Sequence, residues 1–187
     1  MKATSLAIPD VILIEPKVHG DNRGYFFESY NHKQFEEATG LSPNFVQDNH
    51  TKSTKGVLRG LHYQLPPAAQ SKLVRVVDGK VFDVAVDIRK GSPTLGQWTG
   101  EVLTSENKKQ IWIPVGFAHG FVTLSDVSEL IYKTTDYYSP QFECCICWDD
   151  PSLNINWQLH GIPPSLSEKD KQGVEFKDIE YFNEILL

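Results

Sequence analysis

The alternation of side chains along residues 81–88 is the clearest periodic pattern in the chain. Phe, Val, Val and Ile occupy the even positions there, and Val, Asp, Ala and Asp occupy the odd positions. Because successive side chains of a strand point to opposite faces, this pattern predicts a half-buried strand that ends at residues 91–93. Further strand-favouring runs are expected at residues 11–14, 25–30, 97–104, 110–114, 120–124 and 129–135. Many short strands separated by turn residues predict an all-β sandwich or barrel.

Helix is the minority element in this pattern. Asn31 can cap the one convincing helix, in which Phe35 and Ala38 share a face and which Gly40 ends. The charged and less periodic segment after residue 164 predicts a short helix or an arm lying on the barrel.

The length and charge of the chain narrow the possible functions. We expect residues 1–187 to form a single domain with an N-terminal strand arm and a short C-terminal extension. A net charge of -6 provides no global basic field, so we expect no nucleic-acid or membrane partner. No apolar run approaches the roughly 18 residues of a membrane span. The first residues also lack a signal-peptide core, so a cytoplasmic location is expected.

Three cysteines, Cys144, Cys145 and Cys147, lie within four positions of one another. No neighbouring CxxC or HxxxH pattern completes a standard metal site with them. We therefore expect reduced thiols rather than a metal centre.

Residues 56–64 combine apolar, strand-favouring residues with Arg59, Gly60 and His62. A buried guanidinium and imidazole are costly without partners, which suggests an anion to bind and a proton to move. The alternative is a core histidine that pairs with a carbonyl, next to a surface arginine. Arg59 and His62 differ in strand parity, so both can face one cavity only if Gly60 lies in a bulge or kink.

Other polar side chains also interrupt the predicted strands. Taken singly, such residues are usually surface charges, but together they suit a barrel that holds one phosphate or diphosphate ligand. The set consists of Arg23, Glu28, Gln47, Asn49, Arg59, His62, Lys72, Arg75, His119 and Tyr132.

The PxGxxH pattern within residues 113–121 resembles the second motif of the cupin superfamily, whose members are double-stranded β-helix jelly rolls. Metal-binding cupins carry an HxH pattern in their first motif, whereas this chain has His62-Tyr63-Gln64 at the corresponding place. One or two imidazoles would hold a divalent metal poorly, so no metal is expected.

Several further motifs make the resemblance more specific. From about residue 11 to residue 170, the chain resembles the dTDP-4-dehydrorhamnose 3,5-epimerase family. The resemblance implies a cupin jelly roll with a few short helices, and a homodimer in which N-terminal strands are exchanged. The chain departs from the family's pattern at Cys144, Cys145 and Cys147, although Glu143 matches that pattern. The matching motifs are DNRGYF at 21–26, QDNHTKS at 47–53, GVLRGLHYQ at 56–64, KLVRV at 72–76, PVGFAHGF at 114–121 and LSEKD at 166–170.

The resemblance also assigns roles to residues. His62 resembles the family's base, Asp170 its partner and Tyr132 the acid, while Lys72 would stabilise the enolate beside the ketone oxygen. For Phe26 and Phe121, core packing is an alternative to an apolar wall of the site. Arg23 and Arg59 would clamp the diphosphate and Tyr138 would stack on thymine. The substrate-binding set that it implies is Arg23, Phe26, Glu28, Gln47, Asn49, Arg59, Lys72, His119, Phe121, Tyr138, Glu143 and Lys169.

The expected reaction inverts carbon 3 and carbon 5 of dTDP-4-dehydro-6-deoxy-D-glucose, without a cofactor, to give dTDP-4-dehydro-L-rhamnose for dTDP-L-rhamnose biosynthesis. Two rivals from other classes are a metal-dependent cupin oxygenase or isomerase and a non-catalytic cupin that binds sugars or nucleotides. The missing HxH argues against the first, and the His62, Tyr132 and Asp170 set argues against the second. Relatives that invert a single carbon share most of these residues.

Overall fold

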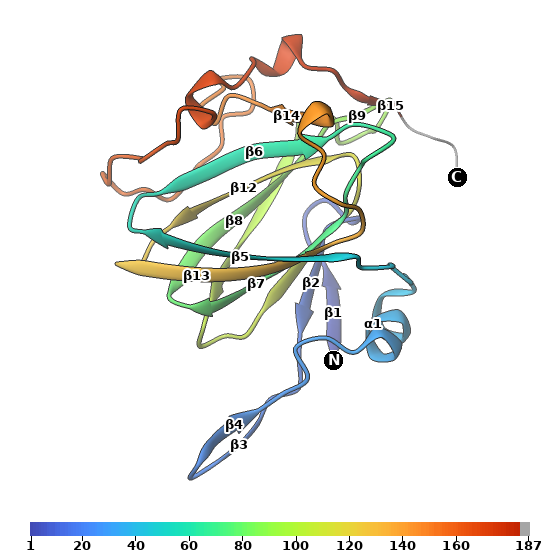
Figure 1. Cartoon of the computed structure of the whole chain (residues 1–187), viewed down its shortest axis with the longest axis vertical. Helices are drawn as coiled ribbons and strands as arrows, with labels where there is room; N and C mark the ends of the chain where they lie inside the picture. The colour runs from blue at the N-terminus through green and yellow to red at the C-terminus, as the bar shows by residue number, and fades with distance from the viewer. Residues whose placement is uncertain (184–187) are drawn as a thin grey trace.

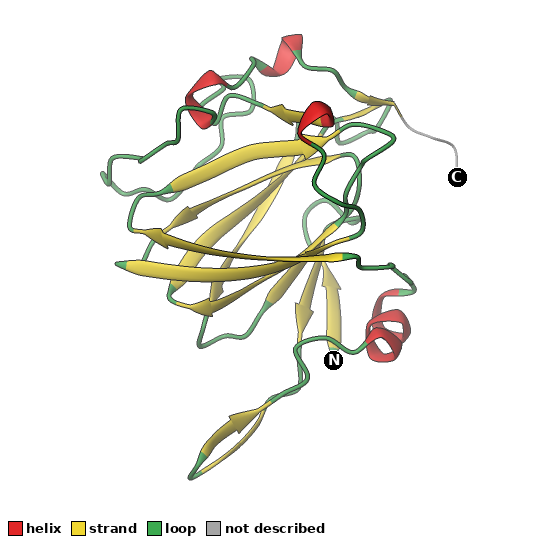
Figure 2. Ribbon diagram, viewed as in Figure 1, coloured by secondary structure: helices red, strands yellow, loops and turns green. Residues whose placement is uncertain are grey.

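The computed structural model describes residues 1–183, which form a jelly roll of two packed antiparallel sheets. Figure 2 shows how strands dominate the molecule. The six-stranded sheet contains, in spatial order, β1 (Lys2–Ser5), β2 (Ile12–Glu15), β11 (Gln110–Ile113), β7 (Lys72–Asp78), β13 (Val127–Thr134) and β5 (Gln47–Thr54). The five-stranded sheet contains β10 (Trp98–Thr104), β8 (Lys80–Asp87), β12 (Phe117–Thr123), β6 (Leu58–Gln64) and β14 (Glu143–Cys145). The all-β prediction is confirmed, with strand bounds that differ from the expected ones by a few residues.

Strand β8 is buried on both faces, so the prediction of a half-buried strand is wrong. Its odd positions Val81 and Ala85 pack between the two sheets. Its even positions pack on the other face against Leu153 and Trp157, from the segment that follows β14. The alternation therefore separates two cores rather than a core and solvent, because the segment after β14 covers the outer face of this sheet (Figure 1).

Helix α1 (His32–Thr39) follows the sequence signals closely. The Asn31 side chain accepts a hydrogen bond from the Gln34 amide at 3.1 Å, and Gly40 ends the helix with a φ of 74°. Phe35 is fully buried against Trp112 beneath the six-stranded sheet. Both predicted caps are confirmed.

A strand was expected over residues 25–30, but strand β4 (Gly24–Phe26) stops after Phe26. Its one partner is β3 (His19–Asp21), and together they form a hairpin that projects from the body (Figure 1). Beyond it the chain turns inward, where the Ser29 carbonyl accepts a hydrogen bond from Gln110 Nε2 at 2.7 Å. Tyr30 packs edge-on against Phe45.

The C-terminal segment lies over the five-stranded sheet, as expected for an arm. Strand β15 (Phe182–Asn183) pairs in parallel with β9 (Arg89–Lys90). No helix within residues 1–183 is both long enough and apolar enough to cross a membrane. Short 3-10 helices span Pro140–Phe142, Asp170–Gln172 and Phe176–Asp178.

Candidate active site

A bulge in β6 shapes the site, as the parity of Arg59 and His62 required. His62 pairs with His119 in β12, whereas Arg59 pairs with Phe121, so β6 holds one more residue than its partner between these points. Gly60 lies in the bulge with a φ of 134°, where a Cβ atom would come within 2.5 Å of the Gly120 Cα. Only glycine fits this close approach of two backbones. The predicted bulge is confirmed.

The bulge also positions the carboxylate that contacts His62. Asp170 Oδ1 lies 2.7 Å from His62 Nε2 and accepts a hydrogen bond from the Gly60 amide at 3.1 Å. Asp170 Oδ2 accepts from the Ser167 hydroxyl at 2.6 Å. Burial opposes ionisation of Asp170, but His62, Ser167 and the Gly60 amide outweigh it and hold the pKa well below the ordinary value. His62 therefore faces a permanent negative charge at neutral pH.

His62 lies on the wall of a cavity of about 120 Å³ between the two sheets. Gln47, Asn49, Lys72 and Tyr132 reach this cavity from the six-stranded sheet, opposite His62. Tyr63, Gln64, Gln70, Tyr138 and Glu143 complete the lining. Strand β5 lines one side of the cavity, and β6, the next strand in the chain, lines the other. Two consecutive strands therefore face one another across the cavity.

Two of these side chains have pKa values that burial has moved. Burial lowers the pKa of Lys72 to about 8, although the charges of Asp83 and Glu143 oppose the effect. Burial raises the pKa of the Tyr132 phenol, which therefore stays protonated near neutral pH. The cavity thus offers a protonated phenol and a cation that is easily neutralised.

One end of the cavity is formed by a charged cluster near the loop after β13. The Tyr138 hydroxyl donates to Glu143 at 2.6 Å, and the Lys169 ammonium pairs with the same carboxylate. The Tyr138 amide donates to Gln47 at 3.1 Å. Gln64 fixes the same loop, because its amide oxygen accepts a hydrogen bond from the Ser139 backbone at 2.9 Å. The half-exposed ring of Tyr138 is held in place by these contacts.

Below the cavity, His119 Nε2 lies 3.0 Å from both oxygens of Asp83, and both residues are buried. Burial lowers the pKa of His119 although Asp83 opposes this, so the imidazole is neutral and donates its Nε2 proton. Sequence reasoning missed Asp83 because it assigned the odd face of this strand to solvent. A carboxylate in an otherwise apolar strand was the available signal. Phe121 lies in the core between the sheets rather than on the cavity wall.

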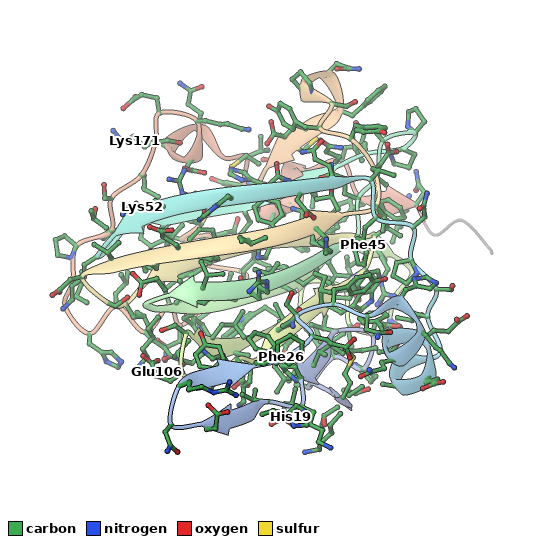
Figure 3. All side chains as sticks on the ribbon, turned by 60° about the horizontal axis from the view of Figure 1, so that its bottom comes forward. His19, Phe26, Phe45, Lys52, Glu106 and Lys171 are labelled. Atoms are coloured by element: carbon green, nitrogen blue, oxygen red, sulfur yellow. The ribbon has the colours of Figure 1, made fainter. Side chains whose placement is uncertain are left out.

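Five other predicted binding residues also lie outside the lining of this cavity, and one of them is Lys169, which pairs with Glu143. Arg59 lies beside it, exposed, with its Nε donating to the Ser53 hydroxyl at 3.1 Å. Arg23, Phe26 and Glu28 belong to the projecting hairpin and its exit (Figure 3 labels Phe26). Phe26 is 69% exposed. Within one chain, the hairpin residues do not meet the other predicted site residues.

Cys144, Cys145 and Cys147 are free cysteines in the structure. Cys145 pairs with His62 across β14 and β6, and its Sγ, a ring nitrogen of His62 and an Asp170 oxygen lie within 4.8 Å of one another. Burial and the neighbouring Asp170 charge raise the pKa of the Cys145 thiol to about 12. The thiol is therefore protonated and unreactive at neutral pH.

The sequence profile of the dTDP-4-dehydrorhamnose 3,5-epimerase family matches residues 5–178. The chain belongs to this family. This family member is an isomerase, and its jelly-roll fold confirms the architecture that the resemblance implied.

Individual relatives match this family member over nearly its whole length. The dTDP-4-dehydrorhamnose 3,5-epimerase of Pseudomonas aeruginosa is 63% identical, over 97% of this chain and 99% of that protein. An epimerase from Legionella pneumophila, solved in complex with dTDP-4-keto-L-rhamnose, is 49% identical, covers 98% of each chain and has a TM-score of 0.94. A 3'-monoepimerase from Streptomyces bikiniensis, solved with dTDP-quinovose, is 33% identical, has a TM-score of 0.87 and covers 95% of this chain and 88% of that one.

Proposed function

We propose that this enzyme inverts carbon 3 and carbon 5 of dTDP-4-dehydro-6-deoxy-D-glucose and forms dTDP-4-dehydro-L-rhamnose, a step of dTDP-L-rhamnose biosynthesis. One observation carries the proposal: His62 and Tyr132 reach the same cavity from opposite sheets. Inversion next to a ketone needs a base on one face of the sugar and an acid on the other. The 63% identity to the Pseudomonas aeruginosa epimerase supports the same reaction.

In the proposed first step, His62 removes the proton on the carbon beside the ketone. Asp170, close to Nε2, favours the tautomer with its proton on that nitrogen, so the lone pair lies on Nδ1. The negative charge of Asp170 also stabilises the imidazolium that forms. Lys72 supplies a positive charge to the enolate oxygen, which is the largest stabilisation that such a site can offer.

In the second step, the Tyr132 phenol protonates the enolate carbon from the opposite face. The phenolate that forms regains its proton from solvent, and His62 releases its own, so the enzyme returns to its starting state. Repetition at the second carbon next to the ketone completes the double inversion. The raised pKa of Tyr132 keeps the phenol protonated until the enolate has formed.

For the nucleotide, we assign Tyr138 to stacking on thymine, and Gln47, Asn49, Glu143 and Lys169 to polar contacts around it. His119, held by Asp83, lies under the sugar end, and Arg59 takes the diphosphate. Phe121 supports this wall from the core.

We further propose that Arg23, Phe26 and Glu28 act in the site of a second copy, in a homodimer. Within this chain the hairpin exposes both Tyr25 and Phe26, and exposed aromatic side chains mark interaction surfaces. The catalytic jelly roll, the N-terminal strand arm and the C-terminal extension would together form one domain.

We propose that the chemistry needs no metal, because proton removal, enolate stabilisation and proton return are all assigned to side chains. The test uses protein dialysed against a strong chelator and incubated with the 4-keto-6-deoxyglucose nucleotide in deuterated water. NMR should locate deuterium at carbon 3 and carbon 5 of a product with the L-rhamno configuration. Label at one carbon only would make the enzyme a monoepimerase, and activity that returns only with added divalent ion would contradict the metal-free mechanism.

A further inference from the structure

Three potential metal ligands from distant parts of the chain meet beside the cavity. They are a ring nitrogen of His62 on β6, Cys145 Sγ on β14 and a carboxylate oxygen of Asp170 on the 3-10 helix Asp170–Gln172, all within 4.8 Å of one another. Sequence spacing does not reveal this group, because its members are far apart in the chain. Strand pairing places Cys145 directly opposite His62, and the Gly60 amide fixes Asp170 beside them.

The state of His62 Nε2 provides a second observation. This nitrogen is buried, and among the residues described here it has no aligned hydrogen-bond acceptor, although Asp170 Oδ1 lies 2.7 Å away. A close but misaligned carboxylate neutralises charge without satisfying the direction of the nitrogen lone pair or proton. A cation placed among the three atoms would satisfy the imidazole, the carboxylate and the thiolate together.

We propose that His62, Cys145 and Asp170 form an inhibitory site for a thiophilic divalent cation of the Zn²⁺ class. Ligand atoms around tetrahedral zinc are about 3.3–3.6 Å apart, given bonds of roughly 2.0–2.3 Å. The three ligand atoms reach this spacing if His62 Nε2 and Asp170 Oδ1 move apart and the Cys145 thiol turns toward the point between them. The set of one nitrogen, one sulfur and one oxygen selects zinc-like ions over Mg²⁺ and Ca²⁺, which prefer oxygen.

Three protein ligands leave a fourth coordination position for water. Binding displaces the proton of the Cys145 thiol and the Nε2 proton of His62, and both protons pass to solvent. Asp170 then neutralises the metal rather than an imidazolium. A metal on Nε2 lowers the basicity of Nδ1, so His62 no longer removes the substrate proton while the cation is bound. This inhibitory effect rests on the proposed role of His62, whereas the binding itself does not.

The two other cysteines provide matched controls for the thiol. Cys144 is the neighbour of Tyr63 across the strand pair and packs against the outer core of the five-stranded sheet. Cys147 donates to Asp149 at 2.9 Å. Neither thiol belongs to the three-ligand group, so Cys144→Ser and Cys147→Ser remove a thiol without removing a ligand.

The binding experiment titrates the full-length, chelator-treated protein with Co²⁺, whose tetrahedral thiolate complexes have a charge-transfer absorption, and then displaces it with Zn²⁺. We expect one thiolate-bound Co²⁺ per chain in the wild type and in both control variants. Cys145→Ser should lose the thiolate band and weaken Zn²⁺ binding by more than the roughly 10- to 100-fold that loss of an outer partner costs. No thiolate band in the wild type, or equal Zn²⁺ affinity in Cys145→Ser, would overturn the proposal.

The activity experiment measures epimerisation at increasing Zn²⁺ concentrations in the same four proteins. Zn²⁺ should inhibit the wild type and both controls at the concentrations that displace Co²⁺, and a chelator should restore turnover. Cys145→Ser should keep its activity without Zn²⁺ and should resist inhibition by Zn²⁺. If the serine variant folds poorly, Cys145→Ala should give the same two results. Thiolate-bound metal without inhibition would keep the site but refute its inhibitory role and the assignment of His62 as the base. Failure of the wild type to epimerise at all would refute the proposed function and leave the Co²⁺ result unaffected.

Discussion

At the scale of single residues, the site works through environments that move three protonation equilibria in useful directions. Asp170 stays ionised beside His62, Tyr132 stays protonated, and Lys72 can exchange its proton near neutral pH. Each shift comes from burial or from a named neighbour. The proposed division of labour between acid and base therefore follows from where the fold places each side chain.

The lowered pKa of Lys72 predicts an alkaline limit to the reaction. Only the ammonium form stabilises the enolate oxygen, so kcat/KM should fall as the pH rises through about 8. A bound diphosphate adds negative charge and favours the ammonium, so the corresponding fall in kcat should lie at higher pH. The measurement is a pair of pH profiles by NMR assay. A kcat/KM that stays level well above pH 8 would mean that Lys72 is not needed in its charged form.

Replacement of Tyr132 by Phe separates removal of a proton from its return. His62 and Lys72 can still form the enolate, but the opposite face has no donor, so His62 should return a proton to the side it left. We expect deuterium to enter the substrate with retention, while inversion falls by about a hundredfold, the scale of a lost general acid. The measurement is the ratio of exchange to inversion by NMR. A parallel fall of both would assign Tyr132 to binding instead.

The residue types of the site could be predicted from the sequence, but several of their contacts could not. His62, Lys72 and Asp170 stand in motifs that resemble one family, and the same resemblance pointed to Tyr132, which stands in none of them. Asp83, which holds His119 from a strand 36 residues away, has no local signal that separates a buried carboxylate from a solvated one. Such contacts depend on strand pairing, which a sequence pattern does not specify.

At the scale of elements, the bulge in β6 links the backbone to the chemistry. Gly60 brings Arg59 and His62 to the same side of the molecule and donates its amide to Asp170. The bulge was predictable because two polar side chains of opposite parity demanded it. The burial of both faces of β8 was not, because the C-terminal segment that covers it has little periodicity of its own.

Gly60→Ala should destabilise the protein and reduce turnover. The new Cβ would lie 2.5 Å from the Gly120 Cα at a φ of 134°, so the β6–β12 pair must separate and Asp170 must shift. Strain of this kind costs on the order of 1–3 kcal/mol, and the clash adds to it. Thermal unfolding measures the effect.

Gly24→Ala is the matched control, because Gly24 has a φ of 135° and a Cβ added there would meet no atom within 4 Å. This variant should show only the cost of the backbone strain and unfold at a temperature nearer the wild type. Equal losses in the two variants would show that the close approach of β6 and β12 contributes nothing.

At the scale of the whole molecule, a chain with a net charge of -6 has to collect cations locally in order to hold a diphosphate. Arg59 lies beside the cavity, but Arg23 lies on the projecting hairpin and pairs with Asp21 at 2.5 Å. The resemblance predicted both arginines and could not say that they lie apart within one chain. The proposed homodimer would resolve this difference by bringing the hairpin of a second copy to the cavity.

Complementation between two inactive variants tests this arrangement. Arg23→Ala removes a residue from the hairpin, and His62→Ala removes the base from the cavity. If hairpins are exchanged, mixed dimers contain one site with both residues intact, so mixing the variants should restore part of the activity. The measurement is turnover before and after subunit exchange, with each variant alone as the control. No recovery despite demonstrated mixed dimers would place Arg23 outside the partner's site.

In the proposed mechanism one base, His62, acts at both carbons beside the ketone. The most direct measurement incubates His62→Ala with the 4-keto-6-deoxyglucose nucleotide in deuterated water and follows carbon 3 and carbon 5 by NMR. We expect exchange at both carbons to fall together, by on the order of 10²–10⁴ or more, while the fold and dTDP binding are retained. Exchange that persists at either carbon, or a loss of only about tenfold, would contradict it and point to a second base.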